Sequence, residues 1–315
     1  MRLLIDCDPG VDDALALIVA AAHPQPEILA VTTVAGNVGV DLTTRNAHFV
    51  LDLLGLDVPV TPGARGPLHR AFEDASDTHG GDGLGNLSRF RLPDGSPKYA
   101  LAPPAPSEDQ AAQAIVDLIQ AHSGEVTLVA TGPLTNLAHA LEVDPAILGR
   151  LSRLVIMGGA YRVRGNVRPW AEYNFWCDPD AAALVVSQPV PKTLVGLDVT
   201  HQVVLERTLV ENEIRPIGSV LSEFVCDATE AYAAFDSRTY GVKGNFIHDA
   251  VALAAALEQE IVSTKPMCVR VETETDRAGQ CVIDHGPSNA EVATSVDAAR
   301  VLSMLQEAIE AGPRR

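Results

Sequence analysis

Two patterns of apolar and polar positions alternate along the first two hundred residues. Continuous runs rich in Val, Ile and Leu are typical of strands that are buried on both faces. They predict strands at residues 3–5, 28–34, 126–130, 154–157 and 193–197. The segments between them have helical spacing and predict helices at 11–22, 43–54, 108–121, 134–141 and 180–187. This alternation predicts an α/β fold: a doubly wound, Rossmann-like, mostly parallel sheet with helices on both faces.

The last third of the chain predicts a more helical portion. Helices are expected at residues 215–234, 248–257 and 297–311, and short strands at 267–271 and 280–283. Two segments without periodicity, 61–106 and 162–170, are rich in Gly, Pro and Arg and are expected to be binding loops. Ser107 and Gln110 have capping-box spacing, which predicts the start of the helix at 108–121. No repeat or linker interrupts the chain, so residues 1–315 are expected to form one domain.

Composition narrows the class of protein. Of the 315 residues, 47% are hydrophobic, which is enough to build a core, and the formal net charge is −18. Because a negative field repels phosphate groups, we expect neither a nucleic-acid partner nor an anionic membrane surface. The five cysteines are scattered without CxxC spacing, and no long apolar span follows a basic start. Free thiols and a cytoplasmic location are the expectation.

Four aspartates stand within eight residues near the start of the chain. Asp6 and Asp8 end the first predicted strand, Pro9-Gly10 turns the chain, and Asp12 and Asp13 begin a helix. The helix dipole favours one or two acids in a first turn. Four close carboxylates repel one another unless a cation neutralises them. Clustered oxygen ligands indicate Ca²⁺ or Mg²⁺.

Polar residues also follow other predicted strands. Asn37 comes after the strand at 28–34, Thr131 after the strand at 126–130, and Asn166, Glu172 and Asn174 lie beyond the strand at 154–157. In a doubly wound sheet the ligand binds beyond the carboxyl ends of the strands. These groups are therefore expected to converge on one crevice and to bind a hydroxyl-rich ligand.

The run Asp-Cys-Asp-Pro-Gly-Val-Asp-Asp at residues 6–13 resembles the N-terminal signature of the inosine–uridine nucleoside hydrolase family. Further segments match in the same order, at 32–37, 131–136, 157–159, 171–174 and 248–249. The resemblance covers nearly the whole chain. It implies hydrolysis of the N-glycosidic bond of ribonucleosides to ribose and free base, in nucleoside salvage, with one bound Ca²⁺. It also implies a homodimer or homotetramer.

Residue roles follow from the same resemblance, by motif position. The implied Ca²⁺ ligands are Asp8, Asp13, Asp249 and the carbonyl of Thr131. The implied ribose contacts are Asp12, Asn37, Met157, Asn166, Glu172 and Asn174. Asp8 would also activate the Ca²⁺-bound water, while His248 and His79 would lie near the base. A histidine that titrates near neutrality would serve as general acid for the departing base.

Two departures from the family pattern leave the preferred base open. Arg162 and Arg164 add positive charge beside the expected ribose site. Between Tyr232 and Ile247 the base-contacting side chains have no one-to-one match.

The sequence is also compatible with two other functions. A metal-dependent phosphohydrolase would use Asp6 or Asp8 as nucleophile and would need a lysine in a loop after a core strand. None of the four lysines follows such a strand clearly. A non-catalytic nucleoside-binding protein on the same scaffold would be expected to lack an acid or the leaving-group histidine, yet all matched positions are present.

Overall fold

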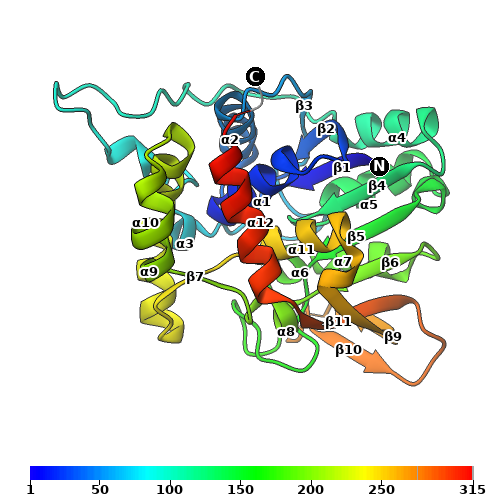
Figure 1. Ribbon diagram of the computed structural model, residues 1–315. Coiled ribbons are helices and arrows are strands. Elements are labelled where there is room, and N and C mark those ends of the chain that lie inside the picture. The colour runs from blue at the N-terminus through cyan, green and yellow to red at the C-terminus, as the bar shows by residue number, and fades with distance from the viewer. Residues whose placement is uncertain (275, 314–315) are drawn as a thin grey trace.

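A nine-stranded sheet forms the centre of the computed structural model, which describes residues 1–274 and 276–313 (Figure 1). The strands are β1 (Arg2–Cys7), β2 (Glu27–Thr33), β3 (Val60–Pro62), β4 (Val126–Ala130), β5 (Arg153–Met157), β6 (Lys192–Val195), β9 (Val262–Val271), β10 (Cys281–Asp284) and β11 (Ala290–Val296). Their order is β10-β9-β11-β6-β5-β4-β1-β2-β3. A separate ribbon pairs β7 (Val204–Glu206) with β8 (Gly244–Phe246).

The central strands β1 to β6 and β11 run parallel, and β9 and β10 extend the sheet antiparallel. The chain starts at β1, winds outward to β3, and returns to place β4 on the other side of β1. Such a reversal opens a crevice at the carboxyl ends of the two central strands. The turn after β1 and Thr131 after β4 therefore lie at the natural ligand position of this fold.

Helices cover both faces of the sheet (Figure 1). They are α1 (Val11–Ala22), α2 (Val40–Leu53), α3 (Ser76–His79), α4 (Ala111–Ala121), α5 (Thr135–Val143), α6 (Tyr173–Cys177), α7 (Pro179–Ser187), α8 (Leu197–Thr200), α9 (Arg207–Leu209), α10 (Val220–Tyr240), α11 (His248–Leu257) and α12 (Ala298–Ala311). One apolar cluster gathers α1, α11 and α12, and the other gathers α4, α5 and α7. All of α11 and nearly all of α1 are buried, which explains their apolar sequences.

The predicted fold class is confirmed, and several elements keep their predicted bounds. The helices at 11–22 and 248–257 and the strand at 126–130 begin and end as expected. The strand expected at 193–197 ends at Val195, because Gly196 caps the short helix α8. The strands β3 and β11 were not predicted from the sequence.

Three helix starts in the prediction are wrong, and one of them, that of the helix expected at 43–54, lies three residues too late because α2 begins at Val40. The helix expected at 215–234 begins at Val220, because Gly218 adopts a left-handed φ of 66° and Ser219 caps the new helix. It then continues to Tyr240. The capping box at Ser107 does not form, since its hydroxyl donates to Asp41 and α4 begins at Ala111.

Among residues 1–274 and 276–313, no helix is both long and apolar enough to cross a membrane.

Candidate functional site

A cavity of about 340 Å³ opens beyond the carboxyl ends of β1, β4 and β5. Every residue predicted to contact ribose lines it: Asp12, Asn37, Met157, Asn166, Glu172 and Asn174. Thr131, Asp249, His79 and His248 line it too. Asp8 and Asp13 are buried behind this lining rather than on it. The structure therefore brings the predicted residues of the site together, with two of the carboxylates forming a layer beneath the surface.

Three buried carboxylates converge at the floor of the cavity. Asp12, Asp13 and Asp249 each place an oxygen within 4.8 Å of the others. Asp8 lies outside this trio, and its Oδ2 accepts from the backbone N–H of Asn37 at 2.7 Å. Among the described residues, Oδ1 of Asp8 and Oδ1 of Asp12 are buried without a hydrogen-bond partner. Buried oxygens that accept no hydrogen bond are available as ligands for a cation.

Burial and mutual repulsion disfavour the charged forms of these acids. Desolvation, with repulsion from Asp13 next, raises the pKa of Asp12 to about 8 and that of Asp8 well above its usual value. The pKa of Asp249 is raised well above normal by burial and then by repulsion from Asp12. A bound divalent cation would offset both the desolvation of the carboxylates and their mutual repulsion, because its positive charge attracts all of them.

Glycines allow the backbone to approach the acids closely. A Cβ on Gly36 would lie 2.0 Å from Oδ2 of Asp8, and one on Gly132 would lie 2.7 Å from its Oδ1. A Cβ on Gly10 would lie 2.6 Å from both Nδ2 of Asn37 and Nδ1 of His79. The glycines in the signature and in the turns after β2 and β4 are therefore required by space.

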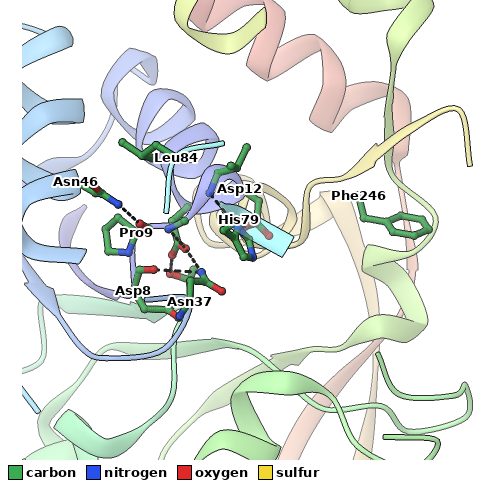
Figure 2. A network of polar contacts seen from close by, with 12 residues as sticks. Asp8, Pro9, Asp12, Asn37, Asn46, His79, Leu84 and Phe246 are labelled. Carbon is green, nitrogen blue, oxygen red and sulfur yellow. Dashed lines mark hydrogen bonds and ion pairs between the residues drawn. The ribbon is translucent and has the colours of Figure 1, made fainter. Parts of the chain in front are cut away.

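Asn37 joins the end of β2 to the turn after β1. Its Nδ2 donates to the carbonyl of Asp8 and to Oδ2 of Asp13, each at 3.1 Å. Figure 2 shows Asp8, Asp12, Asn37 and His79 gathered around the turn at Pro9, with Asn46 reaching that turn from α2. The position of the carboxylates is thus held by amide donors from two further elements.

The segment before α6 supplies a second group of site residues. Glu172 caps α6 by accepting from the backbone of Asn174 and Phe175, and it also accepts from Gly159. Asn174 donates from Nδ2 to the carbonyl of Thr131 at 2.6 Å. The hydroxyl of Thr131 donates to Oδ1 of Asp13 at 2.8 Å. These bonds connect the predicted ribose contacts directly to the carboxylate floor.

Two histidines, His79 and His248, line the cavity and are held by hydrogen bonds. The backbone N–H of Val11 donates to Nδ1 of His79, so the ring proton is on Nε2. Burial lowers the pKa of His79 to about 3. Nδ1 of His248 lies 2.8 Å from the hydroxyl of Thr200, and burial lowers the pKa of His248 well below its usual value. Both rings line the cavity, and because burial lowers the pKa of each, it favours the neutral imidazole, which can still donate an N–H.

The groups needed for a phosphohydrolase do not meet at the cavity. Asp6 is fully buried away from it, where Oδ1 accepts from Thr32 and Asn136. None of the four lysines, which all fall within the described ranges, lines the cavity. Lys98, for example, donates to Asp227 on α10. Neither Asp6 nor Asp8, the two nucleophiles considered for a phosphohydrolase, therefore has a lysine partner among the described residues.

Arg162 does not line the main cavity, so it does not bring positive charge to the expected ribose site as predicted. Arg162 lines a smaller cavity of about 120 Å³ together with Asp198, and Arg164 lines neither cavity. Arg168 lines the main cavity instead, with its guanidinium 4.6 Å from the centre of the Trp176 ring. The loop before α6 turns between these positions, which a reading of the linear sequence does not reveal.

Base-contacting side chains are expected from the sequence between Tyr232 and Ile247, but the sequence does not identify which residues form this wall of the cavity. Tyr232, Phe235, Asp236 and Tyr240 on α10 line it, and the ring centres of Tyr232 and His79 lie 5.0 Å apart. The four-residue spacing of Tyr232, Asp236 and Tyr240 places them on one helix face. That spacing was a usable signal, but the predicted helix ended at residue 234, before Asp236.

The family model described as inosine-uridine preferring nucleoside hydrolase matches residues 3–303. The chain belongs to this family. Membership confirms the resemblance drawn from the signature and the expected class of enzyme, a ribonucleoside hydrolase.

Relatives in the inosine-uridine preferring nucleoside hydrolase family align over nearly the whole chain. The nucleoside hydrolase of that name from Leishmania major is 35% identical, over 98% of this chain and 97% of its own length. Uridine nucleosidase 1 from Arabidopsis thaliana is 36% identical, over 90% of this chain and 82% of its own. A purine-preferring ribonucleoside hydrolase from Gardnerella vaginalis has a similar structure, with a TM-score of 0.88 at 32% identity, covering 99% and 98% of the two chains.

Proposed function

We propose that this family member releases ribose and free base from ribonucleosides in nucleoside salvage, with Ca²⁺ as its ion and residues 1–315 as one catalytic domain. The observation that carries the proposal is the buried group of Asp12, Asp13 and Asp249 beneath a cavity lined by amide and carboxylate side chains. Such a lining suits the hydroxyl groups of a neutral sugar.

The residues present fit a calcium ion. Asp8, Asp13, Asp249 and the carbonyl of Thr131 would hold it, and all of them offer the oxygen ligands that Ca²⁺ prefers. The orphaned Oδ1 of Asp8 and the raised pKa values of Asp8 and Asp249 support the binding of a cation here. When bound, such an ion lowers the pKa of water and orients it for attack.

The side chains would divide the chemistry between sugar and base. Asp12, Asn37, Asn166, Glu172 and Asn174 would bind the ribose hydroxyls, and Met157 would pack beneath the ring. Asp8 would accept a proton from the water that attacks the anomeric carbon. The carboxylates would stabilise the positive charge that develops on the sugar as the N-glycosidic bond breaks. His248, with His79 nearby, would donate an N–H to the departing base.

Substitution of the proposed base tests the mechanism. Asp8→Asn keeps the acceptor for Asn37 but cannot take a proton, so hydrolysis of inosine and uridine should fall at least about 100-fold. Rates of both proteins are to be measured in calcium and in chelator. The matched control is Asp6→Asn, two residues away and outside the cavity, whose rate should stay within about threefold of wild type. An Asp8→Asn enzyme with undiminished turnover would refute the role of Asp8.

The sugar contacts predict a requirement for the 2′-hydroxyl. Removing it leaves buried polar groups such as those of Asp12 and Asn174 without a partner, so 2′-deoxynucleosides should react at least about tenfold more slowly. Paired assays of inosine and 2′-deoxyinosine measure this. Equal values of kcat/KM would contradict the ribose assignments.

A homodimeric or homotetrameric assembly and a cytoplasmic location stay predictions. Sedimentation of the purified protein tests the first, and fractionation of the source cells tests the second.

A further inference from the structure

Asp236 is an acid that lines the cavity but has no role in the proposed mechanism. It lies one turn after Tyr232 on α10, lines the cavity, and is only 2% exposed. Its Oδ2 accepts from the backbone N–H of Phe246 at 2.9 Å. Within the described part of the chain, no hydrogen bond reaches its Oδ1, and no Lys or Arg pairs with it.

The neighbours of Asp236 place it beside the base rather than the sugar. The floor with Asp12, Asp13 and Asp249 and the segment before α6 provide the proposed sugar contacts. Asp236 belongs instead to the wall formed by α10, where Tyr232 stacks near His79. The Phe246 amide that holds Asp236 lies two residues before His248, the proposed donor to the base.

An ionised carboxylate can accept hydrogen bonds but cannot donate them. It therefore attracts an exocyclic amino group and repels a carbonyl oxygen placed at the same point. This distinction separates cytosine from uracil and adenine from hypoxanthine, because each pair differs by amino against carbonyl at one ring position. Burial strengthens both the attraction and the repulsion, because little water screens them.

We propose that Asp236 is a specificity-determining residue that accepts a hydrogen bond from an exocyclic amino group of the nucleobase. The inference rests on the proposed function, since it assumes that the cavity holds a ribonucleoside. The enzyme then favours cytidine over uridine and adenosine over inosine. A well-placed hydrogen bond to a base edge discriminates by about tenfold to a hundredfold.

Asp236→Asn tests the inference while keeping the fold. An amide oxygen at this position still accepts from Phe246, while the amide N–H₂ can donate to a carbonyl oxygen and cannot accept from an amino group. The ratio of kcat/KM for cytidine over uridine, and for adenosine over inosine, should fall at least about tenfold. Assays are run at pH 8, because burial raises the pKa of Asp236 to about 7 and the ionised carboxylate is favoured above that value. The matched control is Glu230→Gln on the same helix, an exposed residue that pairs with Arg89 and should leave both ratios unchanged.

The outcomes separate this inference from the proposed function. A wild-type enzyme that hydrolyses ribonucleosides without an amino preference, or an Asp236→Asn enzyme that keeps the preference, overturns the inference alone. A wild-type enzyme that cleaves no ribonucleoside overturns the proposed function and the inference with it. Inhibition of the wild-type enzyme by free cytosine and uracil gives a second measurement that does not depend on the variant folding. Cytosine should inhibit at concentrations at least about tenfold lower, and equal inhibition would count against Asp236.

Discussion

At the scale of single residues, the site depends on glycines, which have no side chain, as much as on its polar residues. Gly10 stands between Asn37 and His79 at a distance that leaves no room for a methyl group. The backbone N–H of Gly10 donates to Oδ2 of Asp13, and that of Val11 donates to Nδ1 of His79. Any displacement of this turn therefore moves a carboxylate and a histidine together.

Gly10→Ala should cost both activity and stability. The added Cβ must push away Asn37 or His79, so we expect at least a tenfold loss of turnover and about 1–3 kcal/mol less free energy of unfolding. Gly39→Ala is the matched control, because a Cβ there meets no atom within 4 Å. Urea unfolding and nucleoside hydrolysis of the two variants make the comparison, and equal behaviour would contradict the steric argument.

Asp236 should also affect stability in a pH-dependent way. Burial raises its pKa in the folded protein to about 7, above the usual 3.8, so between these values the folded state binds more protons than the unfolded state. The free energy of unfolding that Asp236 contributes therefore falls as pH rises from about 4 to 7. Because Asn does not titrate, Asp236→Asn should gain about 1–3 kcal/mol relative to wild type between pH 4 and pH 8. Urea titrations at the two pH values measure it, and a constant difference would contradict it.

At the scale of elements, α10 owes its position to the loop before α4. Asp227 on α10 accepts from Nζ of Lys98 at 2.7 Å and from the hydroxyl of Tyr99 at 2.8 Å. Gly85 in the same loop, with a left-handed φ of 73°, packs so closely that a Cβ would lie 2.1 Å from the carbonyl of Ala228. These contacts hold the loop before α4, which carries His79, against α10, which carries Tyr232.

Asp227→Ala should loosen that connection. The loss leaves the buried phenol of Tyr99 without its acceptor and the ammonium of Lys98 with only the exposed Glu223, so we expect a cost of about 2–4 kcal/mol in the free energy of unfolding. Glu223→Ala, which removes only the exposed partner of Lys98, should cost less than about 1 kcal/mol. Chemical unfolding of both variants, with limited proteolysis of the loop, tests this order, and the reverse order would refute it.

Local patterns predicted the elements that local sequence determines. The buried helix α1 and strand β4 kept their bounds because their apolar runs end at turns or polar residues. The strand β11 escaped prediction because its short run mixes buried and exposed positions and its partner β6 lies far back in the chain. Two of the three floor carboxylates, Asp12 and Asp13, stand in one compact signature, whereas Asp249 was implied only by the family resemblance. The α10 wall was not predictable, because its place depends on contacts such as Asp227 with Lys98.

At the scale of the whole molecule, the buried acids link ion binding to stability. In chelator, burial and mutual repulsion favour the protonated form of these carboxylates, and their raised pKa values mean that the folded state binds more protons than the unfolded state. Stability without the ion should therefore fall as pH rises above about 4, the usual range of aspartate.

Calcium should raise Tm more at pH 8 than at pH 5. A cation binds the ionised acids of the folded state and replaces the protons that they would otherwise need. We expect a rise of at least about 5 °C at pH 8 with millimolar calcium and a smaller one at pH 5. Thermal scans in calcium and in chelator at both values measure it. A shift that does not depend on pH would contradict the role given to these acids.

The proposed ion site draws its acids from distant parts of the chain, and this has a consequence for biosynthesis. Asp8 and Asp13 leave the ribosome more than two hundred residues before Asp249 on α11. The strand β11, which joins β6 to β9, follows later still. A nascent chain therefore carries the acids of the signature for more than two hundred residues of synthesis before Asp249 can complete the site. The ion becomes available as a stabilising ligand only after α11 has emerged, so it favours the finished fold and not its precursors.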